Sequence, residues 1–398
     1  MTIDGTCKMP DSDAGHPGKS ELFPTFGGMR VGVWRETPSE RRLPVLPEYV
    51  SKLQQLGLQV LIERGLGESI FLPDEAYQQA GARIIPDKSA LLAEAEILLS
   101  LETPDVSRFP HATGKVLIGH LNIWRHLERL DALSKQGWTV FALEKLPRIT
   151  RAQSMDVLSS MAALAGYKAV LLAAVEYGRV MPMLTTAAGT LAPARVLVIG
   201  AGVAGLQAIA TARRLGARVE AYDVRPAARE QVESLGAKFL DLLPDLKAEG
   251  AGGYARPLTE EEQARQKAAL ENAIAEVDIL ITTAAVPGRP APKIVTSQAL
   301  RRMKPGSVVV DLAAETGGNC EDTIPGQTQS IQGITLIAPI NLPSTLPLHA
   351  SQMLARNFYE FLRLFSREGT FTLHRDDEIL AATCLLWQGQ PTETKQPA

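Results

Sequence analysis

One segment constrains the fold of this chain more than any other, because it joins an apolar run, a glycine-rich turn and a helical stretch. It reads RVLVIGAGVAGLQAIATARRLGARVEAYDVR over 195–225. The unbroken apolar run at 196–199 predicts a strand buried on both faces of a parallel sheet. Gly200, Gly202 and Gly205 follow it at GxGxxG spacing and lead into the helical stretch. The segment therefore predicts a βαβ unit that binds a dinucleotide.

Each glycine has a separate physical role in such a turn. Gly200 permits the tight turn, Gly202 lets a pyrophosphate approach the backbone, and Gly205 lets helix and strand pack closely. The helix that starts at this turn directs its N-terminal amides at the phosphates, and Val203 within the turn is a further predicted cofactor-binding residue. A chance GxGxxG would not place the strand, the helix and the following acidic residue in register, so a functional turn is the stronger interpretation.

The acidic residue bears on which dinucleotide is bound. Asp223 ends the next predicted strand, 18 residues after Gly205 (223 − 205 = 18). A carboxylate there accepts hydrogen bonds from ribose hydroxyls and repels a 2′-phosphate, which favours NAD over NADP. Val224 and Arg225 follow it. Because an arginine at this point can hold a 2′-phosphate, NADP stays open as the alternative, although Asp223 argues against it.

The rest of the chain repeats a rhythm of strand-like and helix-like runs. Strands are predicted at 29–34, 58–65, 95–101, 115–121, 138–144, 194–200, 217–223, 277–284 and 307–313. This alternation predicts an α/β fold with two Rossmann-like, doubly wound parallel-sheet domains. A proline-free, Ala/Leu-rich stretch from Ser154 to about Arg179 predicts a long linking helix, and 348–365 predicts another that returns to the first domain.

The predicted division of the chain is therefore discontinuous. Residues 29–155 plus 343–398 make the first Rossmann-like domain, and 156–342 make the NAD(H)-binding domain. Residues 1–28 are rich in Gly, Pro, Ser and Asp and lack an apolar core, so we predict a disordered extension and no secretory signal.

Composition excludes several classes of function. The formal net charge is −3 and no run of Lys or Arg exceeds two residues, which argues against nucleic-acid binding. Cys7, Cys320 and Cys384 are far apart, so they predict neither a metal site nor a disulfide framework and fit a reducing compartment. The longest stretch without charged residues, 323–355, is broken by four prolines, and we expect no membrane span.

Several further segments carry a family likeness. They are RAQSMDVLSSMAALAGYKAV (151–170), GTLAPARVLVIGAGVAGLQAIATARRLGA, YDVRPAAREQVESLGAKF, AGGYA, PGRPAPKIVT and KPGSVVVDLAAETGGNCE. With them the chain resembles the NAD(H)-binding domain I of proton-translocating nicotinamide nucleotide transhydrogenase. The resemblance implies a homodimer seated on a membrane subunit, cytoplasmic and peripheral to the membrane. It also implies direct hydride transfer to NADP(H) held on a separate domain III, coupled to proton translocation.

The resemblance also implies roles for residues near the domain junction. Its positioning residues match Arg148, Gln153, Asp156 and Ser159, which need no acid or base chemistry, and its cofactor-binding positions match Ser154 and Met155. In the family, the glutamine hydrogen-bonds the nicotinamide ribose side. Taken without the resemblance, RAQSMD is an ordinary polar helix start capped by Ser154 or Asp156.

The loop AEGAGGYARP (248–257) matches the family segment that closes over NAD, with Gly253 and Tyr254 at its lid. By itself such a glycine-rich segment is equally typical of a plain surface loop. Gln266 and Ala285 match further positions of the nucleotide site. Ala285 is independently plausible, because it follows a strand end, where ligands of α/β sheets bind.

The main alternative is an NAD-dependent amino-acid dehydrogenase resembling alanine dehydrogenase. That family uses a lysine in a KVKEP-like segment and a histidine in an LHLA-like segment. Here the first reads LSLETP (99–104), without lysine, and the second reads GHLNIW (119–124), so only His120 matches. A strand-end histidine with a structural hydrogen bond is the preferred explanation of His120. A non-catalytic NAD-sensing module is the third possibility, but Gln153 and Tyr254 are both retained.

Overall fold

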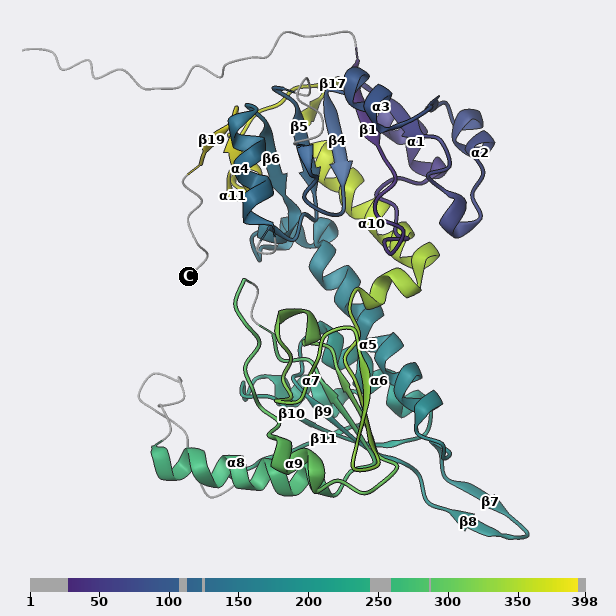
Figure 1. Cartoon of the computed structure of the whole chain (residues 1–398), viewed down its shortest axis with the longest axis vertical. Helices are drawn as coiled ribbons and strands as arrows, with labels where there is room; N and C mark the ends of the chain where they lie inside the picture. Colours follow the sequence, from purple (N-terminus) through teal and green to yellow (C-terminus); the bar gives the residue numbers. More distant parts are fainter. Residues whose placement is uncertain (1–27, 107–112, 124–125, 244–258, 286–287, 393–398) are drawn as a thin grey trace, which may run out of the picture.

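The structure, a computed structural model, describes residues 28–106, 113–123, 126–243, 259–285 and 288–392. The extension predicted at 1–28 lies outside the described residues except for Gly28. Two parallel-sheet bodies lie one above the other, and helices run between them (Figure 1). The predicted α/β fold class is confirmed.

The upper body contains a sheet in the order β19-β18-β6-β5-β4-β1-β2-β3. Its strands are β1 (Met29–Val33), β2 (Leu58–Glu63), β3 (Arg83–Ile85), β4 (Ile97–Ser100), β5 (Val116–Gly119), β6 (Thr139–Ala142), β18 (Cys384–Trp387) and β19 (Gln390–Pro391). β1 to β6 pair in parallel, whereas β18 joins β6 antiparallel. The end of the chain therefore completes a sheet that the beginning of the chain starts.

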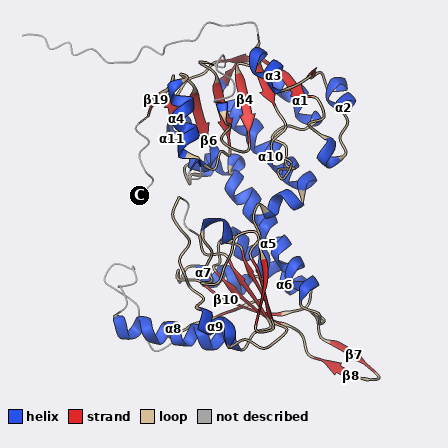
Figure 2. Ribbon diagram, in the orientation of Figure 1, coloured by secondary structure: helices blue, strands red, loops and turns tan. Residues whose placement is uncertain are grey.

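Helices cover both faces of this sheet (Figure 2). They are α1 (Pro47–Gln55), α2 (Asp74–Gln79), α3 (Lys88–Glu94), α4 (Leu127–Lys135), α10 (Pro347–Leu362) and α11 (Glu378–Thr383). One apolar core joins α1, α2, α10 and α11 to the sheet, with Phe141, Phe361 and Phe365 at its centre. A second core joins α3 and α4 to the opposite face around Trp138. Because successive side chains of a strand point to opposite faces of the sheet, alternate residues pack into one core or the other.

The lower body contains a sheet in the order β11-β10-β9-β12-β13-β15-β14. Its strands are β9 (Arg195–Ile199), β10 (Arg218–Tyr222), β11 (Lys238–Phe239), β12 (Ile279–Thr282), β13 (Val308–Asp311), β14 (Thr328–Ile331) and β15 (Ile334–Ile337). β9 pairs in parallel with both β10 and β12, and only β14 runs antiparallel to its neighbour. Every residue of β12 and β13 is buried, as expected for strands covered on both faces.

The lower sheet is likewise covered on both sides. Its helices are α5 (Val157–Glu176), α6 (Val203–Arg214), α7 (Ala228–Ser234), α8 (Glu260–Ala275) and α9 (Ser297–Arg301). Val196 and Val198 face the core shared with α5 and α6. Leu197 and Ile199 face the core shared with α8 and α9. Alternate residues of the apolar run that follows Arg195 therefore pack into two different cores.

Helices α5 and α10 connect the two bodies (Figure 1). The linking helix is predicted from Ser154 to about Arg179, but the structure begins α5 at Val157 and gives Thr150–Met155 a separate 3-10 helix, η5. The reason is local: Asp156 has an extended backbone and its side chain caps α5. The returning helix α10 packs against α1, α5 and η5.

The expectation of no membrane span did not consider the segment that forms α5. This helix is long and apolar enough to cross a membrane by length and composition alone, and 33% of its apolar window is buried. α5 contacts α6, α10 and β13, and these neighbours cover part of its apolar surface.

A two-stranded hairpin, β7 (Leu184–Thr186) and β8 (Gly189–Leu191), is not anticipated by the sequence reasoning. It projects from the lower body at the end farthest from the upper one (Figure 1). Every residue of both strands is exposed, including Leu184 and Leu191. An isolated two-stranded hairpin is marginally stable in water. The exposed leucines of this hairpin form an apolar surface that a neighbour could cover.

Candidate functional site: a glycine turn and a polar cavity on one helix pair

The glycine turn lies where the sequence predicts it, between β9 and α6. Gly200 has a φ of +95°, in the left-handed region that favours glycine. Its amide donates a hydrogen bond to the carbonyl of Tyr222 at 2.8 Å, and its carbonyl accepts one from Thr283 Oγ1 at 3.0 Å. The turn is thus held from both neighbouring strands, β10 and β12.

The other two glycines of the turn have different surroundings. A Cβ on Gly205 would lie 1.8 Å from the carbonyl oxygen of Gly200, so a side chain there would separate helix from strand. A Cβ on Gly202 would meet no atom within 4 Å. Gly202 also stands at the N-cap of α6, whose first residue Val203 is 44% exposed. The helix N-terminus is therefore open at the point where phosphates are held in such turns.

Asp223 is buried beside the turn and is already engaged. Its Oδ2 accepts a hydrogen bond from the Ala201 amide at 2.7 Å, and its Oδ1 accepts from Arg225 Nε at 2.9 Å. Burial opposes ionisation, but the hydrogen bonds from Arg225 and Ala201 outweigh it and lower the pKa of Asp223 below its usual value. The carboxylate is thus ionised at neutral pH, and Val224 beside it is exposed.

The arginine that left the cofactor choice open is therefore paired with Asp223. Arg225 Nη2 lies 3.0 Å from Asp223 Oδ2, and the Arg225 side chain is 60% exposed. A guanidinium whose charge is matched by a buried carboxylate attracts a 2′-phosphate less than a free one does. This matching of the Arg225 and Asp223 charges follows from their contact in the structure and not from the identity of either residue.

The four predicted positioning residues in and around RAQSMD line one cavity of about 330 Å³. It is lined by Leu146, Pro147, Arg148, Ile149, Ala152, Gln153, Asp156 and Ser159. All four predicted positioning residues are in that set. Arg148, Gln153 and Ser154 are exposed, whereas Met155 is buried in the core shared with α10.

Asp156 and Ser159 form a fixed pair in the wall of this cavity. Asp156 Oδ1 accepts a hydrogen bond from the Ser159 amide at 2.9 Å, and Oδ2 accepts one from Ser159 Oγ at 2.6 Å. Asp156 is therefore the N-cap of α5, which the plain helix-start interpretation anticipated. Capping and lining the cavity are compatible, because a carboxylate offers about four lone-pair positions.

Helix α5 links this cavity to the glycine turn through Gly166. A Cβ on Gly166 would lie 2.0 Å from the carbonyl oxygen of Ala204, in the first turn of α6. The two backbones therefore touch beside the turn. Ser159 precedes Gly166 by seven residues, which is about 10 Å along a helix. The sequence reasoning did not single out Gly166, although an isolated glycine inside a helical pattern often signals a close packing contact.

The remaining predicted residues are more scattered. Ala285 is exposed just beyond β12, and the adjacent Ala284 exchanges two hydrogen bonds with the buried carboxamide of Asn319, at 3.0 and 2.7 Å. The sequence reasoning missed Asn319, which stands after a strand end in the segment TGGNC. Gln266 is half-buried on α8. Gly253 and Tyr254 lie outside the described residues.

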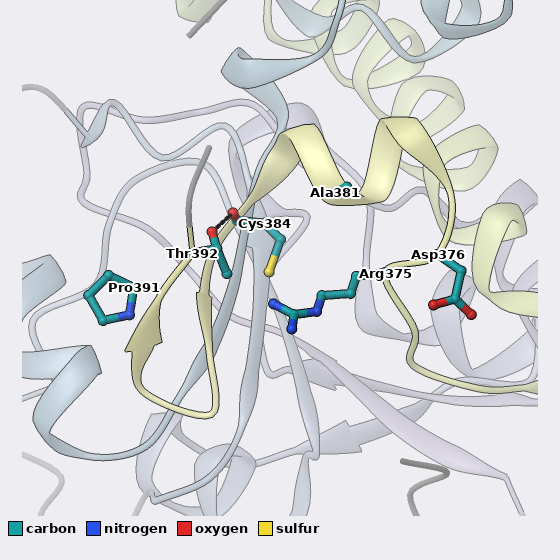
Figure 3. A pocket seen from close by; sticks show the side chains of 6 residues that line it. All are labelled: Arg375, Asp376, Ala381, Cys384, Pro391 and Thr392. Atoms are coloured by element: carbon teal, nitrogen blue, oxygen red, sulfur yellow. Dashed lines mark hydrogen bonds between the residues drawn. The ribbon is translucent and has the colours of Figure 1, made fainter. Parts of the chain in front are cut away.

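A larger cavity, of about 480 Å³, lies elsewhere in the upper body (Figure 3). It is lined by Arg375, Asp376, Ala381, Cys384, Pro391 and Thr392. None of the predicted site residues contributes to it. His120 follows β5 and is half-buried. Among the described residues no group of three or more His, Cys, Asp and Glu side chains is placed to hold a metal ion.

Comparison with known families agrees with this fold. The model of the alanine dehydrogenase/PNT N-terminal domain matches residues 32–165, and that of the C-terminal domain matches 169–394. The chain belongs to the alanine dehydrogenase/PNT family.

Individual relatives fall on both branches of that family. The chain is 42% identical to the first part of the NAD(P) transhydrogenase alpha subunit of Rhodospirillum rubrum, over 91% of this chain and 97% of that protein. The crystal structure of transhydrogenase from Sinorhizobium meliloti matches with a TM-score of 0.81 and 43% identity, over 91% of this chain and 100% of the other. An L-alanine dehydrogenase structure matches with a TM-score of 0.75 and 25% identity, over 91% and 96%.

Proposed function

We propose that this chain is the NAD(H)-binding subunit of a proton-translocating NAD(P) transhydrogenase. It holds NAD(H) and exchanges hydride directly with NADP(H) on a separate domain III. The observation that carries the proposal is the shared cavity of Arg148, Gln153, Asp156 and Ser159 at the start of α5. That helix packs through Gly166 against the first turn of α6, which follows the glycine turn.

The proposed binding follows the helix pair. Gly200, Gly202 and Gly205 would accept the pyrophosphate, and Asp223 would accept hydrogen bonds from the adenosine ribose. The polar cavity about 10 Å along α5 would receive the nicotinamide end. Gln153 is exposed and offers both amide donors and an acceptor there. The lid predicted at Tyr254 remains part of the proposal.

The chemistry asks little of the side chains. Bound NAD(H) would supply or accept the hydride, so no protein group needs to move a proton to the reacting carbon. The residues of the cavity would orient one ring toward the partner subunit and exclude water. The rigid pair Asp156–Ser159 suits that task, because both side chains are fixed by hydrogen bonds at 2.6 and 2.9 Å.

The direct test mixes the full chain with an NADPH-loaded domain III and an oxidised NAD analogue, acetylpyridine adenine dinucleotide. We expect reduction of the analogue, and a Gln153→Ala variant should be about ten- to a hundredfold slower because positioning is lost. Gln55→Ala is the matched control, since Gln55 is an exposed glutamine on α1 outside the cavity. Absence of transfer by the wild-type chain would refute the proposal.

The preference for NAD over NADP is tested at Asp223. NADH should change fluorescence on binding the wild-type chain, and NADPH should not. Asp223→Asn removes charge-assisted hydrogen bonds of about 1.5–3 kcal/mol, a roughly ten- to hundredfold loss of NADH affinity. The same variant leaves Arg225 unmatched, so NADPH affinity should rise. Equal responses of the wild-type chain to both nucleotides would contradict this assignment.

The rival activity is oxidative deamination of an amino acid, as the likeness to L-alanine dehydrogenase suggests. It needs a cationic group for the substrate carboxylate and an acid or base near the reacting carbon. The segment LSLETP offers no lysine for the first task, and only His120 matches for the second. Oxidation of NADH by the purified chain with pyruvate and ammonia would favour the dehydrogenase.

We also propose that the chain forms a homodimer on the cytoplasmic side of a membrane, attached through a membrane subunit. Exposed apolar residues on and near the β7–β8 hairpin support a partner surface: Met183 is 64%, Leu184 43% and Leu191 54% exposed. Light scattering should give twice the mass of one chain. The triple change Met183→Ser, Leu184→Thr, Leu191→Thr should yield monomers if the hairpin carries the contact, and an unchanged mass would exclude it.

A further inference from the structure

The 3-10 helix η5 carries Gln153 to the cavity of the candidate site. Its backbone hydrogen bonds include Ala152 to Ile149 at 3.0 Å and Asp156 to Gln153 at 3.3 Å. Hydrogen bonds of this i→i+3 type have poorer geometry than those of an α-helix. The position of η5 therefore depends on what holds it from outside.

One outside contact comes from the far end of the chain. Asn357, on α10, donates a hydrogen bond from Nδ2 to the carbonyl oxygen of Ser154 at 2.8 Å. The two residues are 203 positions apart in the sequence. Asn357 is only 5% exposed, whereas Ser154 is exposed, so the contact is part-buried. It fixes the direction of the Ser154–Met155 peptide unit, one residue beyond Gln153.

The other atom of the same carboxamide makes Asn357 a poor choice for packing alone. Asn357 Oδ1 is buried and accepts no hydrogen bond from the part of the chain that the structure describes. Burying an acceptor without a donor is unfavourable. A leucine would fill a similar volume beside the apolar neighbours of α10 without that penalty. What the asparagine adds is the hydrogen bond to Ser154.

A second contact holds the other side of η5. Arg151 Nη2 lies 3.1 Å from Asp377 Oδ1 and 3.1 Å from Glu378 Oε1, at the start of α11. The arginine side chain is 48% exposed, so the ion pairs add little to stability. A guanidinium that meets two carboxylates nevertheless has a defined orientation. Both of these polar contacts of η5 thus come from the C-terminal part of the upper body.

We propose that Asn357 is a positioning residue for hydride transfer: through Ser154 it sets the orientation in which η5 presents Gln153 to the cavity. The inference rests on the proposed function. It assigns Asn357 no contact with the nucleotide. Arg151 supports the same segment from the exposed side, with a smaller effect.

The test compares Asn357→Leu with Ser351→Ala in the full chain. Ser351 is also buried on α10, but its hydroxyl serves Leu43 and Pro347 and not η5. Asn357→Leu should lower transfer from NADPH to acetylpyridine adenine dinucleotide about ten- to a hundredfold at saturating nucleotide. The dissociation constant for NADH should stay within about twofold, because the glycine turn is untouched. Ser351→Ala should leave the transfer rate unchanged.

Amide hydrogen exchange gives a readout that does not depend on turnover. The amides of 152–156 should exchange about tenfold faster in Asn357→Leu and at the wild-type rate in Ser351→Ala. Asn357→Ala serves the same comparison if the leucine variant does not fold. Unchanged exchange and an unchanged transfer rate in a folded Asn357 variant would overturn the inference, while the wild-type transfer assay tests the proposed function separately.

Discussion

The two sheets of this molecule share one strand order but differ in the residues that follow the first strand of each. In the upper sheet β3-β2-β1-β4-β5-β6 follows the same pattern as β11-β10-β9-β12-β13-β15 in the lower one. In both sheets the order in which the chain adds strands therefore reverses between two central parallel strands, β1 and β4 in one and β9 and β12 in the other, and open parallel sheets bind ligands at such a point. In the lower sheet this point carries the glycine turn, with open space beside Gly202.

At the matching point of the upper sheet a side chain fills the edge. β1 is followed by Trp34, Arg35 and Glu36 in place of glycines. Glu36 Oε1 accepts hydrogen bonds from Ser100 Oγ at 2.7 Å and from the Leu101 amide at 2.8 Å, directly beyond β4. A backbone amide that could face a ligand is thereby occupied by the protein's own carboxyl group.

Topology alone therefore does not make a nucleotide site. It brings backbone amides to one edge, and the residues after the first strand decide whether they stay accessible. Three glycines leave the lower edge open, whereas Glu36 closes the upper one. Single substitutions test this contrast between the open and the closed edge.

The largest effect is expected at Gly205. In Gly205→Ala the new Cβ would meet the Gly200 carbonyl at 1.8 Å, so helix α6 must move away from β9. Overpacking of this kind costs about 1–3 kcal/mol or more, and we expect a melting temperature lower by roughly 5–10 °C with loss of NADH binding. Thermal unfolding and NADH fluorescence measure both. A variant that melts and binds like the wild type would show that the close contact is dispensable.

A smaller and more selective effect is expected at Gly202. A Cβ there meets nothing within 4 Å, so Gly202→Ala should fold with a wild-type melting temperature. It should nevertheless weaken NADH binding roughly tenfold, about 1.4 kcal/mol, because the methyl group enters the space left for the pyrophosphate. Titration of NADH fluorescence gives the affinity. Unchanged affinity would mean that the open space serves something other than a pyrophosphate.

The smallest effect concerns the closed edge. Burial, with added repulsion from Glu102 and Glu40, raises the pKa of Glu36 to about 7. An acid whose pKa is higher in the folded state holds its proton longer there, so wild-type stability falls as pH rises from about 4.5 to about 7.

Glu36→Gln keeps an acceptor for Ser100 and Leu101 but cannot ionise. Above pH 7 it should be more stable than the wild type by on the order of 1–3 kcal/mol, with the difference disappearing below about pH 4.5. Melting temperatures measured across this range supply the comparison. Parallel curves for the two proteins would show that Glu36 ionises normally, and NADH binding should be the same in both.

Much of the site was predictable because it is local. Gly200, Gly202, Gly205 and Asp223 stand within one βαβ unit, where strand, turn and helix follow from neighbouring residues. Nine strands of the two sheets were likewise predicted from apolar runs, whereas β3, β11, β14, β15, β18 and β19 were not. Strands of only two residues, such as β11 and β19, carry no periodicity to detect.

The sequence by itself determined the fold class, the glycine turn and its acidic partner, because these depend on residues close together in the chain. Only the tertiary structure decided how they are used. It pairs Arg225 with Asp223, sets Gly166 against Ala204, and brings Asn357 to the Ser154 carbonyl. The Gly166 and Asn357 contacts each join two separate elements, and the Asn357 contact spans 203 residues. The pairing of Arg225 with Asp223 depends on how the intervening turn directs the two side chains. Such contacts depend on packing, which no local pattern records.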